Sequence, residues 1–160
     1  MRVLAVDPGY DRLGVAVIEK VNGKEQVLFS DCISSPKDAP MPDRLAAIGQ
    51  AFAALIIEHA PDCIALETLF FSKNAKTAMA VAETRGILLY IARTHNCAVH
   101  EYTPQEVKIA VTGYGKSDKT SVTAMVKRLV PTLRTGALDD EYDAVAVGIC
   151  ALASIRSLST

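Results

Sequence analysis

The start of the chain alternates apolar runs with short polar breaks, a pattern typical of β-strands. Val3–Val6 and Leu13–Ile18 are two such runs, and a third extends from Gln26 to Ile33. Asn22-Gly23 separates the second run from the third. Asn-Gly is a strong hairpin signal because both residues tolerate positive φ. The pattern therefore predicts an antiparallel meander of three strands.

Further along the chain, the apolar spacing becomes helical and is interrupted by two strands. Pro42-Asp43 opens an amphipathic helix. Strands are expected at Asp62–Glu67 and at about Ala98–Tyr102, with a long helix over about residues 74–95 between them. Thr103-Pro104, a cap followed by a first helical residue, begins a short helix to about Val111.

Two more helices complete the pattern. They are expected from Ser117 to Val130 and from Asp139 or Asp140 to Ile155. This order of elements predicts an α/β fold with one five-stranded mixed sheet, three strands antiparallel and then two parallel, flanked by helices.

The length of 160 residues predicts a single domain over residues 1–160, since compact domains hold ~100–200 residues. Half of the residues are hydrophobic and 22% are charged, which excludes a disordered tail. No apolar run is long enough for a membrane span, and the start lacks the order of a signal peptide. We therefore expect a cytoplasmic protein without a membrane partner. The cysteines are expected to be reduced and mostly buried rather than zinc ligands: Cys32, Cys63, Cys97 and Cys150.

The net charge of −1 conceals an uneven distribution. Residues 1–67 carry six basic and ten acidic side chains, whereas residues 68–128 carry nine basic and four acidic ones. The remaining residues are acidic again. This pattern suits a cationic surface beside a carboxylate cluster, and it equally suits a solvated helix face rich in lysine.

Acidic residues stand at three places where strands end or a helix begins. Asp7 ends the first strand, Glu67 ends the fourth, and Asp140 and Asp143 lie one turn apart in the last helix. Each has an ordinary explanation, as a turn, an ion-pair partner or a helix start. If the first and fourth strands are parallel neighbours, however, Asp7 and Glu67 emerge at the same edge. Such a cluster requires cations, and oxygen ligands select Mg²⁺ or Mn²⁺.

Four segments of the sequence resemble the RuvC Holliday-junction resolvases, and the likeness spans essentially the whole chain. They are VDPGYDRLGVAVI (6–18), ALETLFFSKNAKTAMAVAETRG (65–86), EYTPQEVKIAVTGYGKSDKTSV (101–122) and DDEYDAVAVGICA (139–151). The resemblance implies the RNase H-like fold and hydrolysis of DNA phosphodiesters. It also implies two divalent ions per active site, Mg²⁺ or Mn²⁺, held by four acids that here are Asp7, Glu67, Asp140 and Asp143.

The resemblance further implies residues that act on DNA. It places two lysines, Lys108 and Lys119, beside the scissile phosphate, and one aromatic residue, Phe70 or Phe71, on unpaired bases at the junction centre. The remaining candidates for DNA contact are Lys73, Lys76 and Lys116. The ordinary alternatives are solvated helix lysines and phenylalanines that belong to the core.

One departure from the family pattern concerns the last acidic motif. Bulky Glu141 and Tyr142 stand between its aspartates, and Asp139 and Glu141 are expected to crowd the site.

These implications lead to a metal-dependent endonuclease that resolves four-way DNA junctions in recombination and repair. Paired symmetric nicks with 5′-phosphate and 3′-hydroxyl ends require two sites, hence a C2 homodimer, with the helix over about residues 74–95 as its interface. The family also implies cooperation with the RuvA–RuvB branch-migration complex.

Three alternatives stay open. One is an RNase H-like nuclease of structured RNA, against which FFSKNAK and GYGKSDK argue. Another is an actin-like ATP-binding fragment, suggested by Asp7, Gly9 and Gly14. The third is a junction-binding protein without catalysis.

Overall fold

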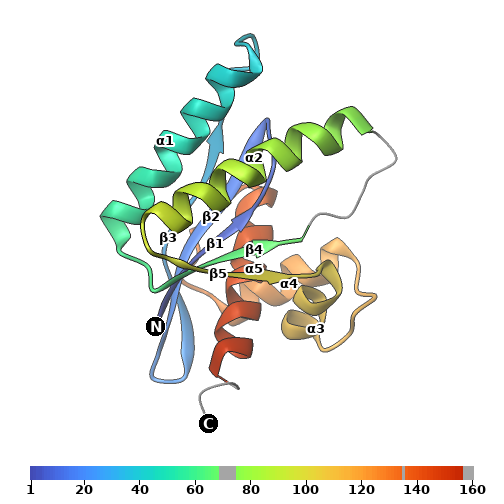
Figure 1. The fold of residues 1–160 in the computed structure, drawn as a ribbon. Helices are drawn as coiled ribbons and strands as arrows, with labels where there is room; N and C mark the ends of the chain where they lie inside the picture. The colour runs from blue at the N-terminus through green and yellow to red at the C-terminus, as the bar shows by residue number, and fades with distance from the viewer. Residues whose placement is uncertain (69–74, 135, 157–160) are drawn as a thin grey trace.

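The computed structural model describes residues 1–68, 75–134 and 136–156, apart from the side chains of residues 75, 76 and 156. The strands are β1 (Arg2–Asp7), β2 (Arg12–Val21), β3 (Lys24–Ser34), β4 (Cys63–Glu67) and β5 (Ala98–Tyr102). The helices are α1 (Met41–His59), α2 (Ala75–Thr94), α3 (Pro104–Thr112), α4 (Lys119–Leu129) and α5 (Asp139–Arg156). Figure 1 shows their arrangement. In the described part of the chain, no helix has both the length and the apolar character to cross a membrane.

The strands form one mixed sheet in the order β3-β2-β1-β4-β5. β2 pairs antiparallel with β1 and β3, whereas β4 pairs parallel with β1 and β5. The predicted sheet is therefore confirmed. Asn22 (φ 51°) and Gly23 (φ 82°) both adopt positive φ in the turn between β2 and β3, as the Asn-Gly hairpin signal requires.

Helices cover both faces of the sheet, because the side chains of β1 alternate between two cores. Leu4 and Val6 pack with α1 and α2, whereas Val3 and Ala5 pack with α5, and all four are fully buried. The order of layers is visible in Figure 1, where α1 and α2 lie on one side of the sheet and α5 on the other. All four cysteines are free, and three of them are buried, as the sequence indicated.

Two glycines allow α5 to lie directly on the sheet. A Cβ on Gly148 would come within 2.5 Å of Cγ2 of Ile18, and a Cβ on Gly14 would come within 2.0 Å of the carbonyl oxygen of Asp140. Gly14 is also the partner of Asp7 in the register of β1 with β2. Because neither glycine has a side chain, the first turn of α5 can lie beside the end of β1.

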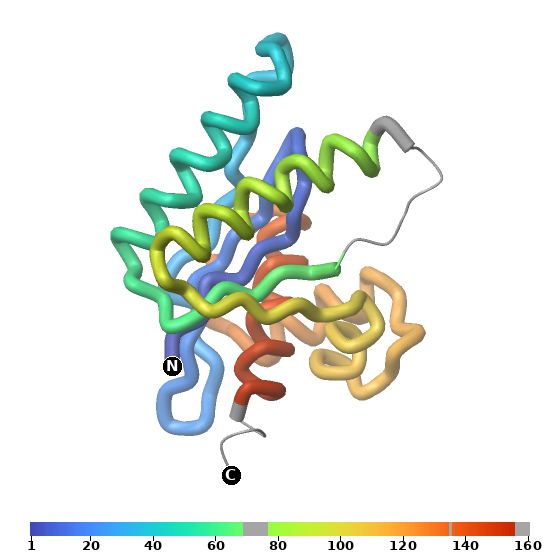
Figure 2. Tube along the Cα trace, in the orientation of Figure 1, coloured from blue at the N-terminus to red at the C-terminus, as the bar shows by residue number. Residues whose placement is uncertain are grey.

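Side-chain caps fix where α3 and α4 begin. Thr103 and Glu106 form a reciprocal capping box at α3. Asp118 accepts a hydrogen bond of 2.8 Å from the backbone N–H of Ser121. Because Asp118 is the cap, α4 begins at Lys119 rather than at Ser117, and the predicted start was wrong by two residues. Figure 2 shows α3 and α4 beside the ends of β4 and β5.

Candidate active site

The carboxylates of Asp7 and Glu67 leave the sheet at one edge. Val6 pairs with Leu66 in the parallel register of β1 with β4, so the residue after each occupies the same position along the edge. The expectation that β1 and β4 are parallel neighbours is confirmed. Two strands that are far apart in sequence thus deliver one acid each to a shared site.

The pKa of Asp7 reflects its burial and the charges of the neighbouring acids. Burial, together with the negative charges of Asp143, Glu67 and Asp140, raises it from 3.8 to about 7. The ammonium group of Lys119 acts in the opposite direction. Asp7 therefore interacts with each of the other three carboxylates, and it is the central member of the cluster.

Each aspartate of α5 has a cationic partner. Oδ2 of Asp140 lies 3.1 Å from Nη2 of Arg12, and the Sγ of Cys32 donates to the same oxygen over 3.7 Å. Oδ2 of Asp143 accepts a hydrogen bond of 2.9 Å from Nζ of Lys119. Two cations therefore partly compensate the charge of the cluster.

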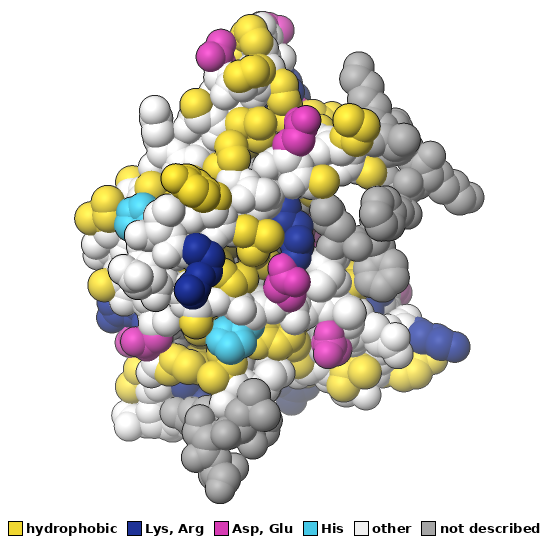
Figure 3. All heavy atoms as spheres, in the orientation of Figure 1, with side chains coloured by type: hydrophobic (Ala, Val, Ile, Leu, Met, Phe, Trp, Pro, Cys, Tyr) yellow, Lys and Arg dark blue, Asp and Glu magenta, His cyan; other side chains and the backbone are white. Residues whose placement is uncertain are grey.

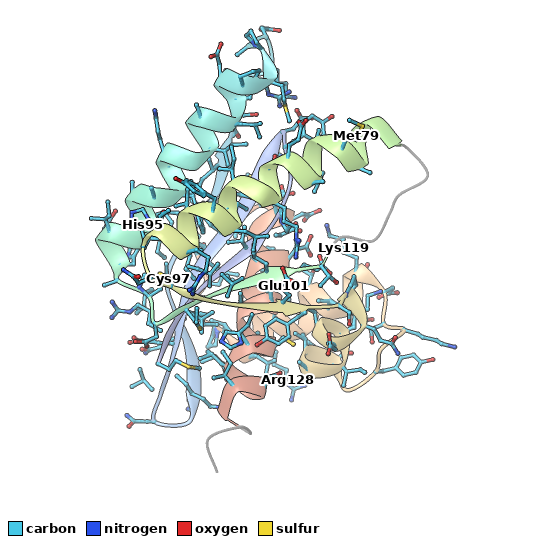
Figure 4. The ribbon with its side chains drawn as sticks, viewed as in Figure 1. Met79, His95, Cys97, Glu101, Lys119 and Arg128 are labelled. Carbon is cyan, nitrogen blue, oxygen red and sulfur yellow. The ribbon has the colours of Figure 1, made fainter. Side chains whose placement is uncertain are left out.

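A cleft of about 220 Å³ opens beside these acids. Its polar lining consists of Glu67, Asp143, Lys108 and Lys119, and apolar side chains of α3, α4 and α5 form the rest. Burial and the charge of Asp143 raise the pKa of Glu67, and the charge of Lys108 lowers it. In Figure 4, Lys119 lies beside the end of β4. The structure thus brings together both lysines and the acids that the sequence singled out.

The donor set of this cluster suits a hard divalent cation. Four carboxylates supply oxygen ligands only, which favour Mg²⁺ or Mn²⁺. Burial and the charge of Asp140 raise the pKa of Cys32 to about 11. Among the described side chains, no three acids, histidines or cysteines are already arranged to hold an ion. A cation at this site would compete with Lys119 for Asp143 and with Arg12 for Asp140.

The sequence did not reveal Arg12 and Cys32 as neighbours of the site. Their positions follow from the strand register, in which Gly14 pairs with both Asp7 and Cys32. The signal was the Asn-Gly turn, since that turn sets the register of β2 with β3.

The expectation that Glu141 crowds the site was wrong. Glu141 is fully buried. Its carboxylate accepts hydrogen bonds from Ser30 Oγ (2.6 Å), Leu138 N (2.9 Å) and Arg134 Nη2 (2.5 Å). Because these groups satisfy it, Glu141 acts as a structural anchor for the first turn of α5. Tyr142 is likewise buried in the core.

The other candidates for DNA contact do not line the cleft or lie outside the described residues. Lys116 is exposed in the turn between α3 and α4. Phe70, Phe71 and Lys73 lie outside the described residues, as does the side chain of Lys76.

The sequence is similar to those of a known protein family. The family model described as crossover junction endodeoxyribonuclease RuvC matches residues 3–151. The chain belongs to the RuvC family. RuvC of Thermosipho melanesiensis is 40% identical over 156 residues, which cover 98% of this chain and 99% of that protein. RuvC of Mycobacterium ulcerans is 41% identical over 151 residues, covering 94% and 82%.

Solved structures agree with the family assignment. RuvC of Thermus thermophilus in complex with a Holliday junction substrate superposes with a TM-score of 0.90 at 25% identity, covering 100% of this chain and 97% of that one. A yeast mitochondrial Holliday junction resolvase shares the fold, with a TM-score of 0.75 at 13% identity and coverage of 99% and 80%. The RNase H-like fold expected for a RuvC relative is thus confirmed. The RNA-processing and ATP-binding alternatives are not favoured.

Proposed function

We propose that this member of the RuvC family is a metal-dependent endonuclease that resolves four-way DNA junctions in homologous recombination and repair. The observation that carries the proposal is the electrostatic grouping of Asp7 with Glu67, Asp140 and Asp143 beside a cleft lined by two lysines. The family supplies the substrate, since the Thermus thermophilus relative is described in complex with a Holliday junction substrate.

The four acids are assigned to two divalent ions, Mg²⁺ or Mn²⁺. Bound ions of this kind lower the pKa of a water and stabilise the attacking and leaving oxygens of a phosphoryl displacement. Asp7 is the shared ligand in this proposal, because its pKa responds to all three other carboxylates.

The lysines are assigned to the scissile phosphate. Lys119 holds its proton beside Asp143, with which it forms a hydrogen bond of 2.9 Å. If a bound cation engaged that carboxylate, the ammonium group of Lys119 would be free to donate to a phosphate oxygen of DNA lying in the cleft. Lys108, on the same cleft, opposes the charge of Glu67. Both stabilise the negative charge that develops during hydrolysis.

The products follow from the bond that breaks. Water loses a proton as its oxygen bonds to phosphorus, the bond from phosphorus to the 3′ oxygen breaks, and that oxygen takes up a proton. The nick therefore carries a 5′-phosphate and a 3′-hydroxyl, which a ligase can seal.

Resolution of a junction requires a second site, and we assign it to a C2 homodimer. α2 is the proposed interface, because it exposes Met79 (65%) and Tyr90 (70%). Figure 3 shows hydrophobic side chains over α1 and α2. Sedimentation of wild type and Tyr90→Asp tests this assignment. A dimer that the variant abolishes supports it, and a wild-type monomer at assay concentration contradicts it.

Other parts of the proposal rest on the family resemblance. They are stacking of Phe70 or Phe71 on unpaired bases, DNA contacts of Lys73, Lys76 and Lys116, cooperation with RuvA–RuvB, and action in the cytoplasm.

The deciding experiment uses a synthetic mobile four-way junction with each strand labelled in turn. Products after incubation with Mg²⁺ or Mn²⁺ are separated on a denaturing gel. Paired cuts at symmetric positions, absent with Asp7→Asn and with a linear duplex of the same sequence, support the function. Cleavage of structured RNA in preference to the junction would support the RNA-processing alternative instead.

A further inference from the structure

A second hollow runs along the exposed face of α4, adjoining the active-site cleft. It measures about 440 Å³ and is lined by Lys119, Thr120, Thr123, Ala124, Lys127 and Asp139. We name it the α4 groove. Lys119 lines both the α4 groove and the active-site cleft, so the two meet at that side chain.

The length of the α4 groove matches a short stretch of nucleic acid. Its helical residues occupy one face of α4 between Lys119 and Lys127, which are eight residues apart. At a rise of about 1.5 Å per residue, their Cα atoms lie about 12 Å apart along the helix axis. A DNA strand rises about 3.4 Å per nucleotide, so this length corresponds to three or four nucleotides. Lys119 and Arg128, labelled in Figure 4, mark the two ends of α4.

Lys127 lies at the far end of the α4 groove from Lys119. Within the described residues, no acidic group lies within ion-pair distance of it, whereas Lys119 and Arg134 are both paired. Nζ of Lys127 lies 5.0 Å from the ring centroid of Tyr142, which is buried in α5. The ring face attracts the ammonium group, and Lys127 is nevertheless exposed.

The residues between the two lysines allow a chain of phosphates to approach. Thr120, Thr123 and Ala124 are short, and threonine hydroxyls can donate to phosphate oxygens. Asp139 is the acid that lines the groove; its side chain is 74% exposed and lies 3.8 Å from Lys119. It opposes a phosphate backbone, which makes its removal an informative test.

We propose that the α4 groove carries the DNA strand away from the active site, with Lys127 contacting a phosphate three or four nucleotides from the scissile one. This inference rests on the proposed function, because it extends the path of the same substrate. Lys127 contributes to the affinity for DNA and not to the chemical step.

The test compares Lys127→Met, which keeps an apolar stem on Tyr142 but removes the charge, with Lys24→Met. Lys24 is exposed where β3 begins, at the opposite end of β2 from Gly14. Junction affinity is measured by fluorescence anisotropy without divalent ions over a series of salt concentrations. Lys127→Met should bind several-fold more weakly, and the slope of log K against log[salt] should become shallower by about 0.9. Lys24→Met should match wild type, and Lys127→Arg should restore binding.

Two further measurements locate the contact. Ethylation of single phosphates should interfere with binding of wild type three or four nucleotides from the cut, and this interference should disappear with Lys127→Met. Asp139→Asn should bind more tightly than wild type. The single-turnover cleavage rate at saturating enzyme should be the same for wild type and Lys127→Met.

The outcomes separate this inference from the proposed function. A wild-type protein that neither binds nor cuts junctions contradicts the function itself. A wild type that cuts junctions, together with a folded Lys127→Met whose affinity and salt slope equal those of Lys24→Met, overturns the inference alone.

Discussion

Replacing Asp7 by asparagine should stabilise the metal-free protein while destroying its activity. The pKa of Asp7 lies at about 7 in the folded chain against 3.8 ordinarily, first because of burial and then because of its acidic neighbours. The difference corresponds to about 4 kcal/mol, which the folded state loses when this carboxyl ionises. This value is an upper bound, because neighbouring charges relax when Asp7 ionises. We therefore expect Asp7→Asn to be more stable by about 2–4 kcal/mol at pH 8 in EDTA.

The raised pKa of Asp7 also determines how the stability of the wild-type protein changes with pH. A raised acidic pKa means that the folded state keeps a proton that the unfolded state has already released. The stability is therefore fully present below about pH 4 and is lost as the pH rises to about 7. The advantage of Asp7→Asn should be absent at pH 4, grow through that interval and stay constant above it.

Urea unfolding at fixed protein concentration measures this difference, with Asp38→Asn as the control. Asp38 is an exposed carboxylate in a turn. Addition of Mn²⁺ should stabilise wild type and leave Asp7→Asn unchanged, because only a species that binds the folded state shifts the equilibrium. An Asp7→Asn variant no more stable than wild type at pH 8, or equally favoured at pH 4, would refute the reasoning.

Three more predictions concern the groups around the acids. Lys119→Met should lower the single-turnover cleavage rate by about 10–100-fold while weakening junction binding much less. The reason is that the ammonium group beside Asp143 stabilises the charge that develops during hydrolysis. Equal losses in rate and affinity would contradict this. Arg12→Ala should lower the Mn²⁺ concentration for half-maximal binding by up to about fivefold, because the substitution removes a cation that competes for Asp140. Calorimetry that shows unchanged or weaker Mn²⁺ binding would contradict this. Gly14→Ala should lower the free energy of unfolding in urea by about 1–3 kcal/mol and suppress cleavage, because the new Cβ would meet the carbonyl oxygen of Asp140 at 2.0 Å. Unchanged stability and activity would contradict this and show that α5 can shift freely.

The sequence predicted the sheet edge where the acids meet because that edge depends on local patterns. Apolar runs located the strands, and each run ended at its acid, so parallel pairing of β1 with β4 was enough to bring Asp7 and Glu67 together. The cluster with α5 needed a further fact, the close approach at Gly14, which concerns residues more than 100 positions apart.

Most of the errors arose where contacts between residues far apart in the sequence decide the outcome. Glu141 looked like a member of the acidic cluster, yet Ser30 and Arg134 hold it in the interior. The sequence pattern did not predict a role for Arg12 or Cys32 at the site, because only the strand register places them beside Asp140. The start of α4 was a smaller error, since Ser117 and Asp118 can both cap a helix and only Asp118 does so.

The most direct test of the shared cation site is anomalous scattering from crystals soaked in millimolar Mn²⁺. We predict anomalous density within about 2.2 Å of the Asp7 carboxylate, between the edge of β1 and β4 and the first turn of α5, with Lys119 released from Asp143. Absence of density at Asp7, with Mn²⁺ bound elsewhere or not at all, would contradict the account.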